Sequence, residues 1–176
     1  MAQVERHDRA LLDALDVPGN SFSGTVWRTT AIGRPPLKGS TSKGRWSGGE
    51  EYSVLYTSCQ QEGALAVVGF RLNLEPIWPS KLMHSIHQLK VECTRVLDLT
   101  GPDILQSLGV NLDTYKSLDY SVTTRISAAA NFMEFEAMLV PNARFTCKNL
   151  VIFAERCNHI SIVESEPVNW DLWRGK

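Results

Sequence analysis

Segments typical of strands and segments typical of helices follow one another along this chain without regular alternation, and that order limits the folds available to it. Runs rich in β-branched and aromatic residues predict strands, and amphipathic periodicity predicts helices. A doubly wound sheet would need strand and helix to alternate throughout. The order therefore favours an α+β fold, and 176 residues suffice for one domain, residues 1–176, with a substantial core. Strands are expected at residues 24–30, 53–57, 89–99, 137–140 and 150–153, and helices at residues 4–15, 60–68, 103–108 and 120–135.

Local signals add detail to this framework. Residues 31–50, rich in glycine, proline and serine, predict a loop long enough to carry function. The helix at residues 60–68 is expected to follow a cap formed by Thr57 and Ser58. The helix at residues 120–135 is expected to be the longest, with a face of small residues.

Composition and charge exclude several classes of function. With a net charge of −1 and a pI near 6.4, the chain has no overall attraction for nucleic acid or for an anionic membrane. Its basic residues are not interleaved with aromatic residues along any element, so we expect no direct binding of nucleic acid. No apolar run has the length of a signal peptide or of a membrane span, and the expected location is the cytoplasm.

The sequence predicts no metal site. The four cysteines form no C-x-x-C pair, so reduced thiols in the core are expected. His84 and His87 have the i, i+3 spacing that metal ligands use on a helix, but no third ligand is evident nearby. The motifs of serine hydrolases, P-loop proteins and Rossmann domains are also missing from the sequence.

Two arginines are candidates for an anion site. Arg28 lies in the first predicted strand, and Arg45 enters the second. Guanidinium groups on neighbouring strands can clamp a diphosphate, while the nearby rings of Trp46 and Tyr56 can take a flat base or a pyridine ring. Alternatively, both rings simply pack inside a hairpin and both arginines lie on the surface. The carboxylates that could pair with such surface arginines are Glu50, Glu51 and Glu62.

Two asparagines flank the loop between the last two predicted strands. Asn142 follows the strand at residues 137–140, and Asn149 opens the strand at residues 150–153. A side chain just after a buried strand often faces a pocket, and an amide can bond either to a ligand or to the backbone of its own loop. Both roles, ligand contact and loop cap, stay open.

Taken in order, these pieces resemble the RES family, named for its arginine, glutamate and serine. Each motif is weak alone, but their order and spacing together are fairly specific. The resemblance spans about residues 24–155, most of the chain. The matching segments are Trp27-Arg28, Gly44-Arg45-Trp46, VLYTS at 54–58, GALA at 63–66, VLDL at 96–99, LVPNAR at 139–144 and NLVIF at 149–153.

Beyond this match, the helix at residues 4–15 and the tail at residues 156–176 are expected as extensions of the family domain. The tail carries Trp170 and Trp173. Large apolar side chains seldom stay exposed, so we expect the tail to pack on its own domain or, second, on a partner protein.

The resemblance implies a fold similar to that of ADP-ribosyltransferases, with mixed or antiparallel sheets and flanking helices. It implies the toxin of a bacterial type II toxin–antitoxin system, paired with an Xre-type antitoxin that has a helix-turn-helix domain. The implied substrate is NAD⁺, with no metal. The leading expectation is transfer of ADP-ribose to a target protein, and the alternative is cleavage of NAD⁺ with water or phosphate as acceptor. Whether several copies of the chain assemble in the complex is left open.

The family's functional residues can be carried over by position. The family arginines fall on Arg28 and Arg45, which would hold the diphosphate, with Trp46 beside them. An aromatic residue of the nicotinamide pocket falls on Tyr56. Together with Asn142, these four side chains would form the cofactor-binding part of the site.

The two other family positions depart from the pattern. Val67 stands where the family has its glutamate, and Asn142 stands where it has its serine. Asparagine can still bond to the ribose or the amide of NAD⁺, but valine cannot stabilise the positive charge that develops as nicotinamide leaves. The favoured explanation is an inactivating change, and the others are a natural inactive relative that only binds a partner, or a substitute acid. The candidate substitutes are Glu50, Glu51 and Glu62.

Overall fold

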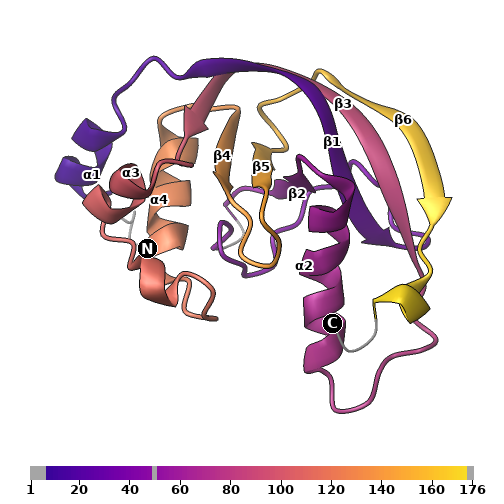
Figure 1. The fold of residues 1–176 in the computed structure, drawn as a ribbon. Helices are drawn as coiled ribbons and strands as arrows, with labels where there is room; N and C mark the ends of the chain where they lie inside the picture. The colour runs from indigo at the N-terminus through magenta and orange to yellow at the C-terminus, as the bar shows by residue number, and fades with distance from the viewer. Residues whose placement is uncertain (1–6, 49–50, 174–176) are drawn as a thin grey trace, which may run out of the picture.

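The computed structural model describes residues 7–48 and 51–173, and it combines one mixed sheet with flanking helices (Figure 1). The predicted α+β class is therefore confirmed. In chain order the elements are α1 (Arg9–Ala14), β1 (Asn20–Ala31), β2 (Val54–Ser58), α2 (Gln61–Leu74), β3 (His84–Asp98), α3 (Pro102–Ser107), η1 (Leu112–Thr114), α4 (Ser121–Phe132), β4 (Ala137–Pro141), β5 (Lys148–Phe153), β6 (Ile160–Pro167) and η2 (Trp170–Leu172).

Five of the six strands form a closed ring. The strand order is β1-β2-β5-β4-β3-β6, and β1 also pairs with β3. The pairing of β3 with β4 is parallel, and the other pairings are antiparallel. The two longest strands, β1 and β3, pair along nearly their whole length and arch together with β6 over the rest of the sheet (Figure 1). This ring fixes β1 and β2, the strands that carry Arg28 and Tyr56, relative to each other.

The central strand β5 is buried on both faces. Successive side chains of a strand point to opposite sides, so its four apolar residues enter two different cores. Val151 and Phe153 join the core that contains the buried side chains of α4, whereas Leu150 and Ile152 join the core beneath β1 and β3. Burying a side chain of this size stabilises the fold by about 1.5–3 kcal/mol. The continuous apolar run of β5 thus places it at the centre.

The helices divide between two sides of the sheet. The helices α1, α3 and α4 gather at one side, and α2 packs against β1 and β2 at the other (Figure 1). The start of α2 approaches the β4–β5 loop closely, because a Cβ atom at Gly63 would lie only 2.5 Å from Sγ of Cys147. Glycine at this position lets the helix reach the strand ends where the site forms.

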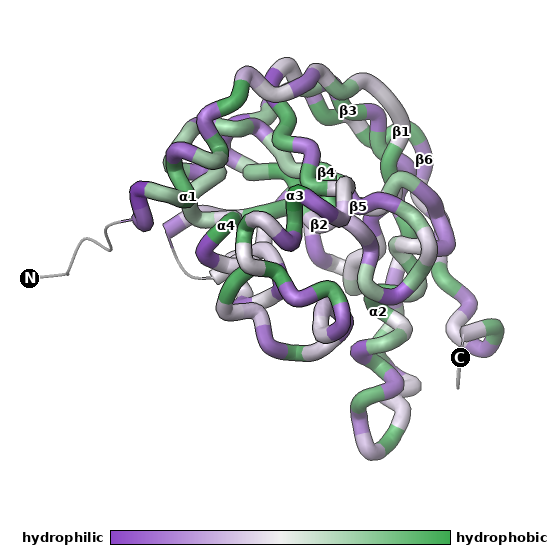
Figure 2. Tube along the Cα trace, turned by 60° about the vertical axis from the view of Figure 1, so that its left-hand side comes forward, coloured by the Kyte–Doolittle hydropathy of each residue, from purple (hydrophilic) through white to green (hydrophobic). Residues whose placement is uncertain are grey.

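The helix α2 is longer than expected, and it corrects one prediction. It has 14 residues against 12 in α4, so the helix near residues 120–135 is not the longest. It stops at Leu74 because Pro76 favours extended backbone in Glu75, whose φ and ψ are −69° and 138°. The loop that follows projects from the body of the molecule (Figures 1 and 2), and its Ile77 is 84% exposed.

The predicted cap of α2 is wrong. Gln60 occupies the cap position and makes no side-chain cap bond. The hydroxyl of Thr57 instead donates to the carbonyl of Leu150 at 2.6 Å, and that of Ser58 donates to Oδ1 of Asn149 at 2.7 Å. Both hydroxyls tie β2 to β5, and the second also orients Asn149.

The tail beyond residue 156 contains a strand that the sequence did not predict. The strand β6 pairs with β3, and nearly all of its residues are exposed. Trp170, after it, is 8% exposed, and its Nε1 donates to Nδ1 of His84 at 2.9 Å. The expectation that the tail packs on its own domain is confirmed for Trp170. At the other end, α1 covers part of the expected helix at residues 4–15, and residues 1–6 lie outside the described residues.

The helices of this protein were also compared with the length and hydropathy of membrane-spanning segments. Among the described residues, no helix has both the length and the apolar character needed to cross a bilayer. The buried apolar side chains form the two cores described above.

Candidate functional site

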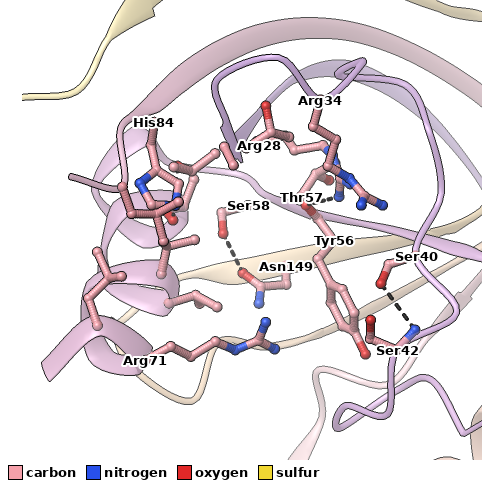
Figure 3. Close-up of a pocket in the computed structure, with 18 of the residues that line it drawn as sticks. Arg28, Arg34, Ser40, Ser42, Tyr56, Thr57, Ser58, Arg71, His84 and Asn149 are labelled. Atoms are coloured by element: carbon pink, nitrogen blue, oxygen red, sulfur yellow. Dashed lines mark hydrogen bonds between the residues drawn. The ribbon is translucent and has the colours of Figure 1, made fainter. Parts of the chain in front are cut away.

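Two adjoining hollows open between α2, β2 and the loop that precedes β2. The larger hollow has a volume of about 360 Å³ and the smaller one about 170 Å³. Their shared wall consists of Tyr56, Val67, Arg71 and Asn149. Hydroxyl and basic side chains from β1, from the loop that follows it and from β3 also line the larger hollow (Figure 3), among them Arg28, Thr30, Arg34, Ser40, Ser42, Lys43 and His84. The smaller hollow is more aromatic, and its lining includes Arg45, Trp46, Phe70, Tyr120 and Arg144.

All charged side chains among the described residues of these linings are cationic. Arg28, Arg34 and Lys43 line the larger hollow, Arg45 and Arg144 the smaller one, and Arg71 both. Of the acids considered as substitutes for the family glutamate, Glu51 and Glu62 are exposed and line neither hollow. Glu50 lies outside the described residues. The site is therefore suited to an anionic ligand.

Arg28 is a buried cation at the floor of the larger hollow. Only 6% of the residue is exposed, and its two Nη atoms donate to the backbone carbonyls of Tyr56 and Lys38, each at 3.2 Å. Its buried Nε has no hydrogen-bond partner in the structure. Burial, and then the charge of Arg34, lowers the pKa of Arg28 to about 10, so the side chain stays protonated at neutral pH.

Tyr56 connects the wall of the site to the loop before β2. Its hydroxyl accepts from the backbone N–H of Trp46 at 3.0 Å and lies 2.7 Å from Oγ of Ser47. Since Ser47 donates its own proton to the carbonyl of Ser42, the tyrosine donates to Ser47. Burial raises the pKa of Tyr56, which keeps the ring neutral. A Cβ at Gly44 would lie 2.7 Å from this hydroxyl, so the loop needs glycine there.

Arg45 lies in the loop before β2 and lines only the smaller hollow. Its guanidinium donates to the carbonyls of Tyr115 and Ser117, and it lies over the rings of Tyr115 and Tyr120 at 4.8 and 5.0 Å. Arg28 and Arg45 thus line neighbouring hollows with Tyr56 between them, where the sequence predicted one clamp. Trp46 is 2% exposed and packs in a core, which agrees with the interior alternative, although it also lines the smaller hollow.

The sequence matches a known protein family. The RES domain family matches residues 25–171, most of the chain. The chain belongs to the RES domain family. The match continues past residue 155, where the motifs ended, and includes β6 and Trp170.

This RES domain resembles proteins of known structure and name. It is 25% identical over 143 residues, 77% of each chain, to the NAD(+) phosphorylase MbcT of Mycobacterium tuberculosis and to that of Mycobacterium bovis. Its structure is similar to a chain in the crystal structure of the M. tuberculosis MbcT–MbcA toxin–antitoxin complex, with a TM-score of 0.82 and 23% identity. That likeness covers 95% of this chain and 96% of the other, so the two chains share the same overall fold.

Val67, at the position of the family glutamate, lies in the wall shared by the two hollows of this RES domain. It is one helical turn before Arg71 in α2, and both residues line the two hollows together with Asn149 and Tyr56. Residues i and i+4 of a helix are neighbours, so a carboxylate at position 67 would stand between cations of both hollows. The valine leaves this position apolar.

Asn142, at the position of the family serine, lies behind the site and lines neither hollow. Its Oδ1 accepts from the backbone N–H groups of Arg144 and Phe145 at 2.7 and 3.0 Å. Its Nδ2 donates to the carbonyl of Gly63 at 3.2 Å and to Oδ1 of Asn149 at 2.9 Å. Of the two roles left open, these bonds make Asn142 the loop cap, while Asn149 is the amide that lines the site.

The two histidines considered as metal ligands lie on β3, not on a helix. His84 bonds to Trp170, and His87 lies between Oγ1 of Thr30 at 2.9 Å and Oγ of Ser165 at 2.7 Å. Burial lowers the pKa of both rings. Within residues 7–48 and 51–173, no cluster of three or more His, Cys, Asp or Glu side chains could hold a metal ion.

Sequence reasoning missed four of the cations that line the site, namely Arg34, Lys43, Arg71 and Arg144. They come from the loop after β1, from α2 and from the β4–β5 loop, which only the folded chain brings together. One signal was available, since Arg71 lies four residues after the family glutamate position and α2 continues past it.

Proposed function

We propose that this RES domain consumes NAD⁺ as the toxin of a bacterial toxin–antitoxin pair. The observation that carries the proposal is the exclusively cationic lining of the two hollows, which includes the buried Arg28. A buried cation without a counter-charge is unfavourable, and a ligand that bears phosphate groups offsets this cost. The larger hollow has the size of small-molecule sites.

In the proposed complex, the diphosphate of NAD⁺ lies against Arg28 and Arg34 in the larger hollow. The nicotinamide end points toward Tyr56 and position 67 in the shared wall. Asn149 bonds to the ribose or the amide, and Asn142 acts through it as a positioning residue. We also propose that the ring of strands is an ADP-ribosyltransferase-like fold.

The reaction breaks the bond between C1 of a ribose and the ring nitrogen of nicotinamide. The electron pair of this bond stays with the nicotinamide, which becomes neutral, and positive charge develops on the ribose. An acceptor oxygen then supplies the pair for the new bond to the same carbon. A carboxylate at position 67 would stabilise the developing charge. Val67 cannot, so we propose that the present chain is catalytically impaired.

For the acceptor we propose inorganic phosphate. Relatives with 25% identity are named NAD(+) phosphorylase, and a cationic site attracts phosphate as well as NAD⁺. Attack by HPO₄²⁻ gives nicotinamide and a phosphate ester of ADP-ribose, with no further reactant. Transfer of ADP-ribose to a target protein, the leading expectation from the family resemblance, breaks the same bond and is the competing outcome of the test.

The substitution Val67→Glu tests the reaction. Removing one preorganised charge-stabilising group commonly costs a factor of about 10²–10³ in rate. We therefore expect Val67→Glu to raise the rate of nicotinamide release by about that factor in phosphate buffer. Val67→Gln, which has the same length but no charge, is the matched control and should stay slow.

The products distinguish the acceptors. With labelled NAD⁺, a phosphate ester of ADP-ribose indicates phosphorolysis, and free ADP-ribose indicates hydrolysis. A discrete labelled protein band in a cell extract indicates transfer to a protein. If Val67→Glu releases no nicotinamide with phosphate and with extract, the enzymatic proposal fails and a binding module remains.

The proposed partner is an antitoxin with a helix-turn-helix domain, and the proposed place of action is the cytoplasm. The fold resembles that of MbcT, which was crystallised in a complex with MbcA. We expect expression of Val67→Glu to arrest bacterial growth, and co-expression of the antitoxin encoded next to it to restore growth. Growth unaffected by Val67→Glu would favour the non-catalytic reading.

A further inference from the structure

The smaller hollow gathers three arginines whose charges no described carboxylate balances. Arg45, Arg71 and Arg144 line it together. The salt bridges found among the described residues involve Arg9 and Arg156 instead. Three like charges around one small space repel one another, and an anion in that space would offset the repulsion.

Two of these guanidinium groups are held in place by the protein. Arg45 donates to two backbone carbonyls and lies over two tyrosine rings. Arg144 stacks on Phe70 at 3.4 Å from the ring centre. A planar guanidinium fixed in this way loses little freedom when it bonds to an oxyanion, and its fork of donors matches two oxygens of a phosphate.

The pKa of Arg144 also reflects how close the three charges are. Burial lowers the pKa of Arg144, and the charges of Arg45 and Arg71 lower it further. Arg71 reaches from α2 toward Asn149 and Tyr56 (Figure 3) and faces both hollows. It therefore links the three-arginine cluster to the place where position 67 meets the substrate.

The smaller hollow is too small to enclose a whole dinucleotide by itself. Its volume of about 170 Å³ is below the roughly 300–1,000 Å³ of sites for drug-sized molecules. Since a water molecule takes about 30 Å³ of liquid, the hollow has room for a tetrahedral oxyanion with a few waters. The larger hollow has more than twice this volume.

We infer that Arg45, Arg71 and Arg144 form a second anion subsite that takes a phosphate-sized oxyanion, separate from the diphosphate subsite at Arg28. This inference rests on the proposed function. In that function the oxyanion would lie on the other side of position 67 from the bond between ribose and nicotinamide. Arg45 is thereby assigned to this subsite, in place of the single diphosphate clamp that the sequence predicted.

Inorganic phosphate is the probe for this subsite. Its affinity is measured by calorimetry at constant ionic strength for the native chain and for four single variants. Arg71→Gln and Arg144→Gln should each weaken phosphate binding about tenfold or more, since each removes a charge-assisted contact. Arg34→Gln, which changes only the larger hollow, is the matched control and should leave this affinity unchanged. Arg144→Lys keeps the charge and should lose less than Arg144→Gln, which guards against a mere folding defect.

A parallel titration with NAD⁺ distinguishes the sources of the oxyanion. Arg34→Gln should weaken NAD⁺ binding, and Arg144→Gln should leave it within about twofold. The proposed subsite is overturned if phosphate does not bind the native chain. It is also overturned if Arg144→Gln lowers the affinity for NAD⁺ but not the affinity for phosphate, since the arginines would then hold the diphosphate of NAD⁺. Failure of the proposed function looks different, because then NAD⁺ does not bind while phosphate still depends on Arg71 and Arg144.

Discussion

At the scale of single residues, the hydroxyl of Tyr56 connects two parts of the site. It bonds to the loop that carries Arg45, while the carbonyl of the same residue accepts from Arg28. A displacement of this ring would therefore disturb both hollows. Gly44 is the residue that permits its present position, because its missing side chain leaves room for the hydroxyl.

The substitution Gly44→Ala should move the loop before β2 away from the aromatic ring of Tyr56. The added methyl carbon would lie 2.7 Å from the Tyr56 hydroxyl, so one of the two must move. We expect the affinity for NAD⁺ to fall by about tenfold and the free energy of unfolding to fall by about 1–2 kcal/mol. Calorimetry and urea unfolding measure the two effects.

Gly24→Ala is the control for this experiment. A Cβ at Gly24 meets only the ring of Phe22, at an ordinary 3.5 Å. The control should leave both quantities nearly unchanged. Equal effects at Gly24 and Gly44 would contradict the role assigned to the Tyr56 contact.

At the scale of elements, polar side chains join β3 to its neighbours β1 and β6. His87 bonds to Thr30 of β1 and to Ser165 of β6. His84, three residues earlier, accepts from Trp170 of η2. Both imidazoles are neutral in this arrangement, because burial lowers their pKa, and for His87 the nearby charge of Arg28 adds to the effect.

This arrangement predicts a loss of stability in acid. The unfolded chain binds protons at these histidines from about pH 6.5 downward, while the folded chain does so only at lower pH. The unfolded state thus holds more protons in that window, and the free energy of unfolding should fall as the pH drops below 6.5. Urea unfolding at pH 7.5 and 5.0 measures it. His87→Gln should reduce the difference, and an unchanged pH dependence in that variant would argue against the assignment.

The packing of η2 gives a second prediction at this scale. Trp170 lies edge-on against Trp78 and His84 and comes near Gly69 of α2. Replacing a buried tryptophan by alanine costs about 3–5 kcal/mol, so Trp170→Ala should lower the free energy of unfolding by about 3 kcal/mol. Leu172→Ala, at a side chain 65% exposed, should change it by less than about 0.5 kcal/mol. Similar small losses in both would mean that the tail is not part of the cooperative fold.

The elements that the sequence predicted well are those whose burial is complete. The apolar run of β5 is predicted because both of its faces are covered, and β4 is buried at three of its five residues. The edge strand β6 was missed because its exposed residues include two glutamates and two serines, which do not signal a strand by composition. The cations of the site were missed for another reason, since Arg34, Arg71 and Arg144 are far apart in sequence and converge only through tertiary structure.

At the scale of the whole molecule, charge is distributed unevenly. The chain has a net charge of −1, yet the described residues that line the two hollows carry only positive charge. The near-neutral total therefore does not reveal this local concentration of positive charge.

Binding of an anion should stabilise the entire fold. At a concentration of 100 times its dissociation constant, a ligand adds about 2.7 kcal/mol, which for a protein of this size corresponds to a rise in Tm of roughly 5–10 °C. We expect NAD⁺ to produce such a rise in thermal unfolding, and the rise to shrink with salt. In Arg28→Met, which removes the buried charge, the rise should disappear, and an equal rise there would exclude Arg28 from the binding site.

The place of Val67 in the common wall of the hollows has an evolutionary consequence. Valine and glutamate codons can differ by a single base. Under the proposed function, one point mutation at this position abolishes or restores activity, while the cationic linings of both hollows stay as they are.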